Sequence, residues 1–136
     1  MSSTNKDVVK EYYRAALAGE IDTVRTLMHV ELRVVEAASL PYGGVKTGPD
    51  GLVELLHEFY ATWDNCQVWV KDLIAENDWV VALTEMSGTA KKSGISFTVP
   101  LSEVYRLKDN KIIEITPFYF DTKLLHDAYA GHRQSS

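Results

Sequence analysis

The second half of the chain alternates apolar and polar residues over long stretches, and this pattern restricts the fold more than any other feature. The alternation predicts four strands, at residues 67–76, 79–90, 95–107 and 111–120. Turn residues separate them, at Asn77-Asp78, Lys92-Ser93-Gly94 and Asp109-Asn110. Successive strands of this length must curl in a chain of 136 residues, so we expect a strongly curved antiparallel sheet.

The first half carries helical spacing instead. Thr4 and Asp7 form a capping-box pattern ahead of apolar residues at helical intervals. Further helices are predicted at residues 21–28, 49–63 and 121–131. A strand at 32–36 and a loop at 39–48 lie between them, and residues 132–136 are expected to fray. Helices first and hairpins later are typical of one α+β domain, here residues 1–136, whose helices cover one face of the sheet and enclose a cavity.

Charge and hydropathy exclude several classes of partner. The formal net charge is −5, whereas a nucleic-acid surface needs clustered Lys and Arg, so no nucleic-acid partner is expected. No apolar run approaches the length of a membrane span, and the first residues lack the apolar segment of a signal peptide. Cys66 is the only cysteine, which excludes an internal disulfide and suits a protein of the reducing cytoplasm.

Motifs for cofactors and metals are missing from the sequence. The segment Gly43-Gly44-Val45-Lys46-Thr47 superficially resembles a phosphate-binding loop, but Val45 separates Gly from Lys and no βαβ pattern surrounds it. The four histidines are scattered along the chain, and His57 lies off the apolar stripe of its predicted helix. The sequence therefore predicts neither a cofactor nor a metal site.

Two glutamates fall on faces of predicted strands that are otherwise apolar. Glu36 shares a face with Leu32 and Val34, and Glu103 interrupts the apolar row from Ile95 to Leu107. A carboxylate against apolar surface is costly when ionised, so its pKa rises and it can act as an acid or a base near neutral pH. Two structural alternatives remain: a strand-end Glu can lean into solvent, and a buried Glu can pair with Arg or Tyr. A bulge at Pro100 would also reverse the facing of Glu103.

Aromatic residues supply candidates for the wall of a ligand pocket. Tyr12 lies on the core side of the first helix, from which its hydroxyl could reach the cavity. Four more aromatic residues are candidates for substrate binding: Phe59, Trp63, Tyr105 and Tyr119. Packing in the core or at an interface would place aromatic rings at the same positions, so both interpretations stay open.

Several segments resemble the SnoaL-like cyclases and ketosteroid isomerases of the nuclear transport factor 2-like superfamily. The similarity extends over about residues 5–130 and is found in Val8-Val9-Lys10-Glu11-Tyr12, Ala18-Gly19-Glu20-Ile21-Asp22, Gly48-Pro49-Asp50-Gly51-Leu52, Val104-Tyr105-Arg106-Leu107, Asn110-Lys111-Ile112-Ile113-Glu114 and Tyr119-Phe120-Asp121-Thr122. The resemblance implies a cone formed by a curved sheet with the N-terminal helices packed on its concave face. It also implies a homodimer through the outer face of the sheet. Because this superfamily contains enzymes and pure binding proteins, the resemblance is specific for the fold and not for the reaction.

The resemblance also implies roles for single residues. Tyr12 falls where ketosteroid isomerases keep the tyrosine of the oxyanion hole, and Glu36 falls where they keep the aspartate base. The protonated acid of that oxyanion hole would fall at Ser102 or Glu103, and strand alternation favours Glu103. In SnoaL-like cyclases Asp121 would be the acid/base residue, although an Asp before a short helix is also an ordinary N-cap.

Two classes of function follow as hypotheses. The first is a cofactor-free enzyme that moves a proton next to a carbonyl group in a small apolar, polyketide- or steroid-like substrate, by isomerisation, aldol-type cyclisation or dehydration. The second is a non-catalytic module that binds a ligand in the cone or serves a larger enzyme as an accessory subunit. The two differ in whether the cavity presents an acid and a base to the same ligand.

Overall fold

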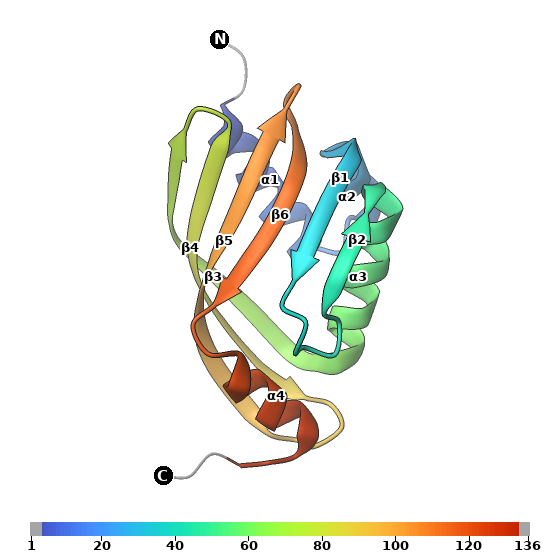
Figure 1. Cartoon of the computed structure of the whole chain (residues 1–136), viewed down its shortest axis with the longest axis vertical. Coiled ribbons are helices and arrows are strands. Elements are labelled where there is room, and N and C mark those ends of the chain that lie inside the picture. The colour runs from blue at the N-terminus through green and yellow to red at the C-terminus, as the bar shows by residue number, and fades with distance from the viewer. Residues whose placement is uncertain (1–3, 134–136) are drawn as a thin grey trace.

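The computed structural model describes residues 4–133 as one curved sheet covered by helices (Figure 1). Its helices are α1 Asn5–Leu17, α2 Ile21–Thr26, α3 Gly48–Thr62 and α4 Thr122–Ala130. Its strands are β1 Met28–Glu36, β2 Gly44–Thr47, β3 Trp63–Glu76, β4 Trp79–Ala90, β5 Ser96–Lys108 and β6 Lys111–Tyr119. His132 and Arg133 are exposed, and the rest of the tail that was expected to fray, residues 134–136, lies outside the described residues.

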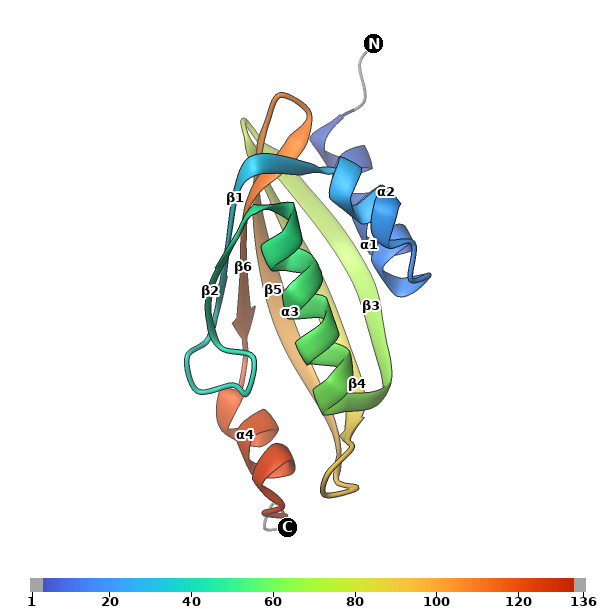
Figure 2. The same cartoon turned by 90° about the vertical axis from the view of Figure 1, so that its right-hand side faces the viewer.

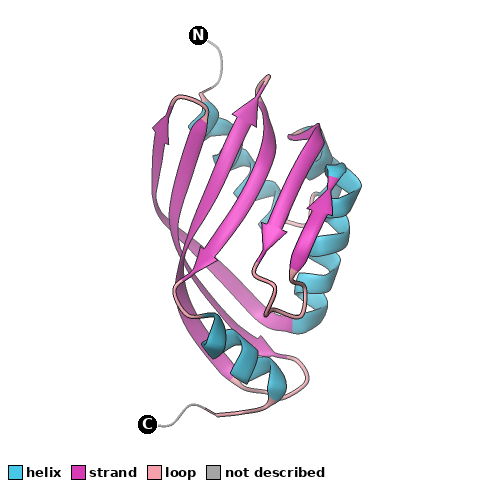
Figure 3. Cartoon of the chain, viewed as in Figure 1, coloured by secondary structure: helices cyan, strands magenta, loops and turns pink. Residues whose placement is uncertain are grey.

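The six strands form a single open sheet in the order β2-β1-β6-β5-β4-β3. All neighbouring strands are antiparallel except β1 and β6, which run parallel (Figure 3). Helices α1, α2 and α3 lie on the concave face, and α4 follows β6 at one end of the sheet (Figure 2). The expected α+β class, with a curved sheet and N-terminal helices on its concave face, is confirmed.

Local signals in the sequence explain where the helices begin. Thr4 caps α1 in a capping box in which its side chain accepts a hydrogen bond from the Asp7 N–H. Pro49 occupies the first turn of α3, where its missing N–H costs no hydrogen bond. Asp121 caps α4 by accepting a hydrogen bond from the Leu124 N–H at 3.2 Å. No helix among the described residues is both long and apolar enough to cross a membrane.

The three expected turns join the long strands. Asn77 between β3 and β4, and Asp109 and Asn110 between β5 and β6, adopt positive φ angles, which Asn and Asp tolerate better than most residues. The β4 and β5 strands pair without a shift in register, so Pro100 causes no bulge between them. Glu103 therefore keeps the inward direction that strand alternation predicts.

Helix α2 ends at Thr26, two residues before the predicted end, and three strand boundaries differ more clearly from the sequence-based expectations. Strand β1 begins at Met28, which pairs with Ile112 of β6 before the chain reaches the predicted start, and the register shifts before Arg33 and Val34 pair with β6 again. Part of the predicted loop 39–48 forms β2, a short edge strand paired with β1. Strand β3 begins at Trp63, directly after α3, and Asn65 with a positive φ angle accompanies the register shift that follows.

The loop between β1 and β2 is fixed to the core. Leu40 and Tyr42 are buried although they lie outside any helix or strand. A Cβ atom at Gly43 would lie only 2.3 Å from the Ala37 carbonyl oxygen, so the chain needs glycine to pass so close to its own backbone. The loop thereby holds the Tyr42 ring inside the domain.

Candidate functional site

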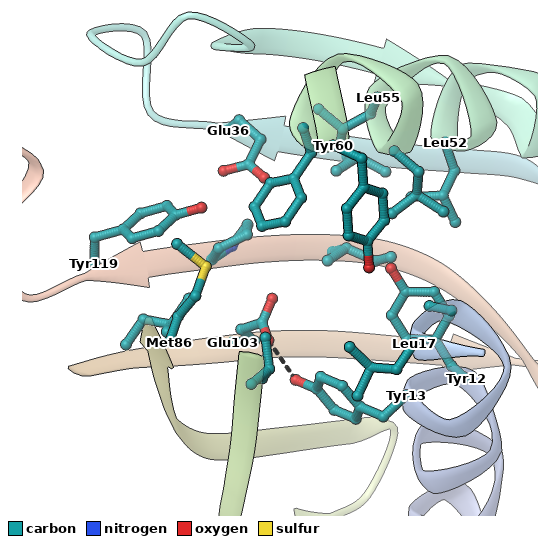
Figure 4. A pocket seen from close by; sticks show the side chains of 18 residues that line it. Tyr12, Tyr13, Leu17, Glu36, Leu52, Leu55, Tyr60, Met86, Glu103 and Tyr119 are labelled. Atoms are coloured by element: carbon teal, nitrogen blue, oxygen red, sulfur yellow. Dashed lines mark hydrogen bonds between the residues drawn. The ribbon is translucent and has the colours of Figure 1, made fainter. Parts of the chain in front are cut away.

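A cavity lies between helices α1 and α3 and the concave face of the sheet (Figure 4). Its volume is about 80 Å³, which suits a compact ligand. Leu17 and Tyr60 line it and are also exposed, so they mark its mouth. The apolar side chains around it come from α1, α3 and five strands, and the lining residues with oxygen-bearing side chains are Tyr12, Tyr13, Glu36, Tyr60, Glu103 and Tyr119.

Sheet register brings the two glutamates together. Val34 of β1 pairs with Ile115 of β6, so Glu36 lies two residues further on, beside Pro117. Glu103 of β5 pairs with Pro117 directly. The two glutamates therefore flank the central strand β6. Because neighbouring strands lie slightly less than 5 Å apart, about 10 Å separates their Cα atoms. The small proline ring between them leaves room above the sheet, into which both carboxyl groups point (Figure 4).

The Glu36 carboxyl is buried without full hydrogen bonding. Only 7% of the residue is exposed, and its Oε1 atom has no hydrogen-bond partner among the described residues. Burial, reinforced by the nearby Glu103 carboxyl, raises the pKa of Glu36 to about 8, and the Tyr119 hydroxyl offsets only part of this shift. An unpartnered carboxyl oxygen that faces a cavity can accept a proton from a bound molecule.

The Glu103 carboxyl has a partner that the sequence analysis missed. The Tyr13 hydroxyl donates a hydrogen bond of 2.5 Å to Glu103 Oε1 (Figure 4). Burial raises the pKa of Glu103, and this hydrogen bond lowers it in part. Tyr13 follows Val9 by four residues in α1 and so lies on the same helix face, a spacing that could have identified it in the sequence.

A second chain of hydrogen bonds leads to the cavity from the other side. The Trp63 Nε1–H donates to the Tyr42 hydroxyl at 3.0 Å, and the Tyr42 and Tyr119 hydroxyl groups lie 3.2 Å apart. Since an indole N–H can only donate, the Tyr42 oxygen is an acceptor, and its own proton is then free to be donated to Tyr119. In that arrangement the Tyr119 O–H is left to donate into the cavity, next to Glu36.

The structure brings together five of the eight predicted site residues. Glu36, Glu103, Tyr12, Phe59 and Tyr119 all line the cavity. The Tyr12 hydroxyl points toward the Tyr60 hydroxyl near the mouth (Figure 4). The hydrogen bond to Glu103 comes instead from Tyr13, the next residue of α1.

The other three predicted residues lie outside the cavity lining. Asp121 caps α4, so its carboxylate is used by the helix N-terminus. Trp63 is buried in the core against Phe97 and reaches the cavity only through Tyr42. Tyr105 is fully buried behind Tyr12 and Tyr13, and its hydroxyl has no hydrogen-bond partner among the described residues.

The described lining of the cavity carries hydroxyl and carboxyl groups and no basic side chain from Lys, Arg or His. Burial raises the pKa of each lining tyrosine, so their hydroxyl groups stay protonated and can only donate or accept hydrogen bonds. Within residues 4–133, no group of three or more His, Cys, Asp and Glu side chains could hold a metal ion.

Comparison with known proteins identifies the fold. The family model of the SnoaL-like domain matches residues 9–115. An NTF2-like protein of Burkholderia thailandensis is 23% identical, with a TM-score of 0.86 over 93% of this chain and 98% of that one. A protein of a Jannaschia species, named a SnoaL-like polyketide cyclase, is 18% identical, with a TM-score of 0.83 over 98% of this chain and 99% of that one.

A third similar structure is that of TerC, co-crystallised with polyporic acid. It is 20% identical, with a TM-score of 0.84 over 94% of this chain and 99% of TerC. At these identities the likeness establishes the NTF2-like fold, as the sequence resemblance implied. The sequence matches no functionally curated protein.

The raised pKa of Glu36 predicts how stability depends on pH. The folded protein holds the Glu36 proton up to about pH 8, whereas the unfolded chain loses it near pH 4.5, the ordinary pKa of a glutamate. The stabilisation from this retained proton is complete below about pH 4.5. It is lost as the pH rises from there to about pH 8, by up to about 1.4 kcal/mol of unfolding free energy per pH unit. Between pH 5 and pH 8, the unfolding free energy of the wild type should therefore fall by at least ~2 kcal/mol relative to that of Glu36→Gln, which has no proton to lose at this position. Urea unfolding at each pH measures the difference.

The matched control is Glu31→Gln, because Glu31 is an exposed residue of the same strand. Its unfolding free energy should follow the wild-type curve across the pH range. If the Glu36→Gln curve also ran parallel to the wild type, Glu36 would not be a protonated buried acid.

Proposed function

The chain belongs to the SnoaL-like domain family, and we propose that it is a cofactor-free acid/base enzyme for a small apolar carbonyl compound. The observation that carries this proposal is the unpartnered Glu36 Oε1 in the same cavity as the Glu103 carboxyl held by Tyr13. Glu36 has an oxygen free to take a proton from a substrate. Glu103 accepts a hydrogen bond from Tyr13 at Oε1, and in its protonated form it can donate one to the substrate. This is the division of roles that proton abstraction next to a carbonyl requires.

The proposed reaction begins with the Glu36 carboxylate. It removes a proton from the carbon next to the substrate carbonyl, and the electron pair moves onto the carbonyl oxygen. The neutral Glu103 carboxyl donates its O–H to that oxygen while its Oε1 accepts the hydrogen bond from Tyr13. Because the cavity is mostly apolar, this hydrogen bond to the developing charge is stronger than it would be in water.

The later steps return the proton to the substrate. Delivery of the proton by Glu36 to a different carbon gives isomerisation. Attack of the enolate on a second carbonyl, with the proton passed to the alkoxide that forms, gives aldol-type cyclisation. Loss of a β-hydroxyl group, which takes that proton and leaves as water, gives dehydration. Tyr119 stands beside Glu36 as a second donor, which suits it to orient the substrate.

Ionisation of the two carboxyl groups is coupled. The Glu103 carboxyl raises the pKa of Glu36 by its proximity, so a second negative charge in the cavity is unfavourable. We therefore expect the active form to hold one proton on the pair. The fraction with an ionised Glu36 increases as the pH rises toward about 8, and kcat/KM should increase with it.

The size of the cavity limits the substrate. A volume of about 80 Å³ is small beside the several hundred Å³ of typical ligand pockets, so a compact substrate fits best. A fused ring system would enter only if Leu17 and Tyr60 turned away from the mouth. The co-crystal of TerC with polyporic acid and the name of the Jannaschia protein support an aromatic or polyketide-like compound.

A non-catalytic binding or accessory module is the second candidate. The observation in its favour is the raised pKa of Glu36, because a base with a pKa of about 8 is mostly protonated at neutral pH. In such a module the two carboxyl groups would serve as hydrogen-bond donors to a ligand. A single cysteine suits a reducing compartment such as the cytoplasm for either function.

An α-proton exchange assay tests the catalytic proposal without knowledge of the full reaction. A panel of small cyclic ketones and enones is incubated in deuterated buffer, and deuterium uptake at the α-carbon is followed by NMR. We expect the wild type to accelerate uptake for at least one compound and Glu36→Gln to be slower by about 100-fold or more. Glu31→Gln should match the wild type. Equal rates for the wild type and Glu36→Gln would contradict the proposed base.

We also propose that the chain forms a homodimer through the outer face of the sheet. Five large apolar side chains on β3, β4 and β6 are exposed there: Trp69, Ile74, Trp79, Leu83 and Phe118. Light scattering should give about twice the mass of the 15.3 kDa chain for the wild type and a lower mass for Leu83→Glu. A monomeric wild type at micromolar concentration would contradict this assembly.

A further inference from the structure

We propose that a groove between α1 and β3 binds the phosphate group of a small organic phosphate, outside the cavity that holds the two glutamates. The groove is lined by Lys6, Lys10 and Tyr13 of α1 and by residues 70–73 of β3, which lies beside α1 (Figure 2). Its volume is about 460 Å³, within the range of small-molecule sites. The site does not depend on the proposed reaction, because it uses neither carboxyl group of the cavity.

The lining of this groove is positively charged, although the chain as a whole has a net charge of −5. Three lysines, Lys6, Lys10 and Lys71, line it together with a single acid, Asp72. Within residues 4–133, neither Lys6 nor Lys10 makes a hydrogen bond or a salt bridge. The groove therefore holds two exposed cations without an ionic partner and a third beside them.

The acids next to these lysines are already engaged. Asp72 Oδ1 accepts a hydrogen bond from the following backbone N–H at 2.9 Å. Asp7 lies near Lys10, but its Oδ2 accepts a hydrogen bond of 3.2 Å in the capping box of α1. The charges of Lys6 and Lys10 are therefore available to an anion from solution.

The positions of Lys6 and Lys10 are unfavourable for the helix that carries them. Lys6 lies in the first turn of α1, where the helix dipole favours negative charge. Lys10 follows four residues later on the same side of the helix, so the two ammonium groups repel each other. A phosphate in the groove relieves both effects. An arrangement that costs stability until an anion is present indicates a role in binding.

A bulge in β3 supplies the third lysine. Alternate residues of a regular strand face opposite sides, yet all four residues from 70 to 73 line the groove. The pairing with β4 shifts between Val70 and Asp72, which makes Lys71 the extra residue of a bulge on an edge strand. Lys71 lies 3.6 Å from the Glu85 carboxylate, which is long for an ion pair. Bulges redirect side chains, and the redirected residue here is a cation of the groove.

The lining suits a phosphate ester better than a carboxylate. Lysine ammonium groups act as separate point charges, which match the double negative charge and three oxygens of a phosphate monoester. No described residue of the lining is an arginine, whose planar group pairs with both oxygens of a carboxylate. Val70, which is exposed, and the buried Tyr13 and Leu73 add apolar surface for the organic part of the ligand.

Tyr13 separates the groove from the cavity and lines both of them. An organic phosphate therefore reaches the groove in one of two ways, as a separate molecule or as the tail of a ligand whose other end lies in the cavity. Both share the same phosphate chemistry in the groove. Met86 lines only the cavity, so its methyl group distinguishes them.

The test uses phenyl phosphate and benzoate as probes and methyl NMR of the whole chain in low salt. At about pH 7.5, where the phosphate is a dianion, phenyl phosphate should shift the Val70 and Leu73 methyl signals with a Kd of about 1 mM or lower. Benzoate should bind roughly tenfold more weakly, and added salt should weaken the binding of phenyl phosphate. An additional shift of the Met86 methyl signal identifies the tail of a cavity ligand, and an unchanged signal identifies a separate molecule.

Matched variants locate the phosphate. Lys10→Gln should lower the affinity for phenyl phosphate by about fivefold or more, and Lys10→Arg should keep most of it. Lys91→Gln removes the same charge from the turn between β4 and β5 at the opposite end of the sheet (Figure 1), and should leave the affinity unchanged. Without ligand, Lys10→Gln should be at least as stable as the wild type in urea, because it removes a repulsion.

Three results would overturn the inference. They are the absence of a saturable shift of Val70 and Leu73, an affinity for benzoate equal to that for phenyl phosphate, and a loss of stability in Lys10→Gln with unchanged affinity. None of these results affects the α-proton exchange assay, which tests the cavity alone.

Discussion

The burial of two carboxyl groups on the concave face of one sheet is the constraint on which the site depends. A carboxylate in apolar surroundings is costly, and a second one facing the same space adds its own desolvation cost and repels the first. This cost raises the pKa of both Glu36 and Glu103, and the hydrogen bond that the Tyr13 hydroxyl donates to Glu103 offsets part of the shift there. The stability of the fold and the chemistry of the cavity are therefore linked through the same protons.

The architecture creates this situation through sheet register and curvature. Strands β1, β6 and β5 lie side by side, so residues far apart in the sequence come into one row across Pro117. Curvature turns that row toward α1 and α3 (Figure 2), and aromatic residues of both helices line the space between. Because the tyrosines remain neutral, only the two glutamates change charge with pH. The same cavity then suits the proposed proton transfer from a neutral carbonyl compound.

Much of the fold could be predicted from the sequence because it follows from local periodicity. Alternation placed Glu103 on the inward face of β5, and the capping pattern at Thr4 placed the start of α1. The parallel pairing of β1 with β6 could not be predicted, since it joins segments about 80 residues apart through contacts that no local pattern records. The sequence also could not decide whether Tyr12 or Tyr13 contacts Glu103. The answer depends on how α1 is rotated about its axis against the sheet, and helical spacing alone does not fix that rotation.

The account is tested most directly by the ionisation of Glu36 itself. The side-chain carboxyl carbons of uniformly ¹³C-labelled protein can be titrated by NMR, with the Glu36 signal assigned by its absence in Glu36→Gln. The account predicts a midpoint for Glu36 near pH 8, together with a raised midpoint for Glu103. A Glu36 midpoint near 4.5, the ordinary value for a glutamate, would mean that the carboxyl is solvated, and the proposed buried acid/base site would lose its physical basis.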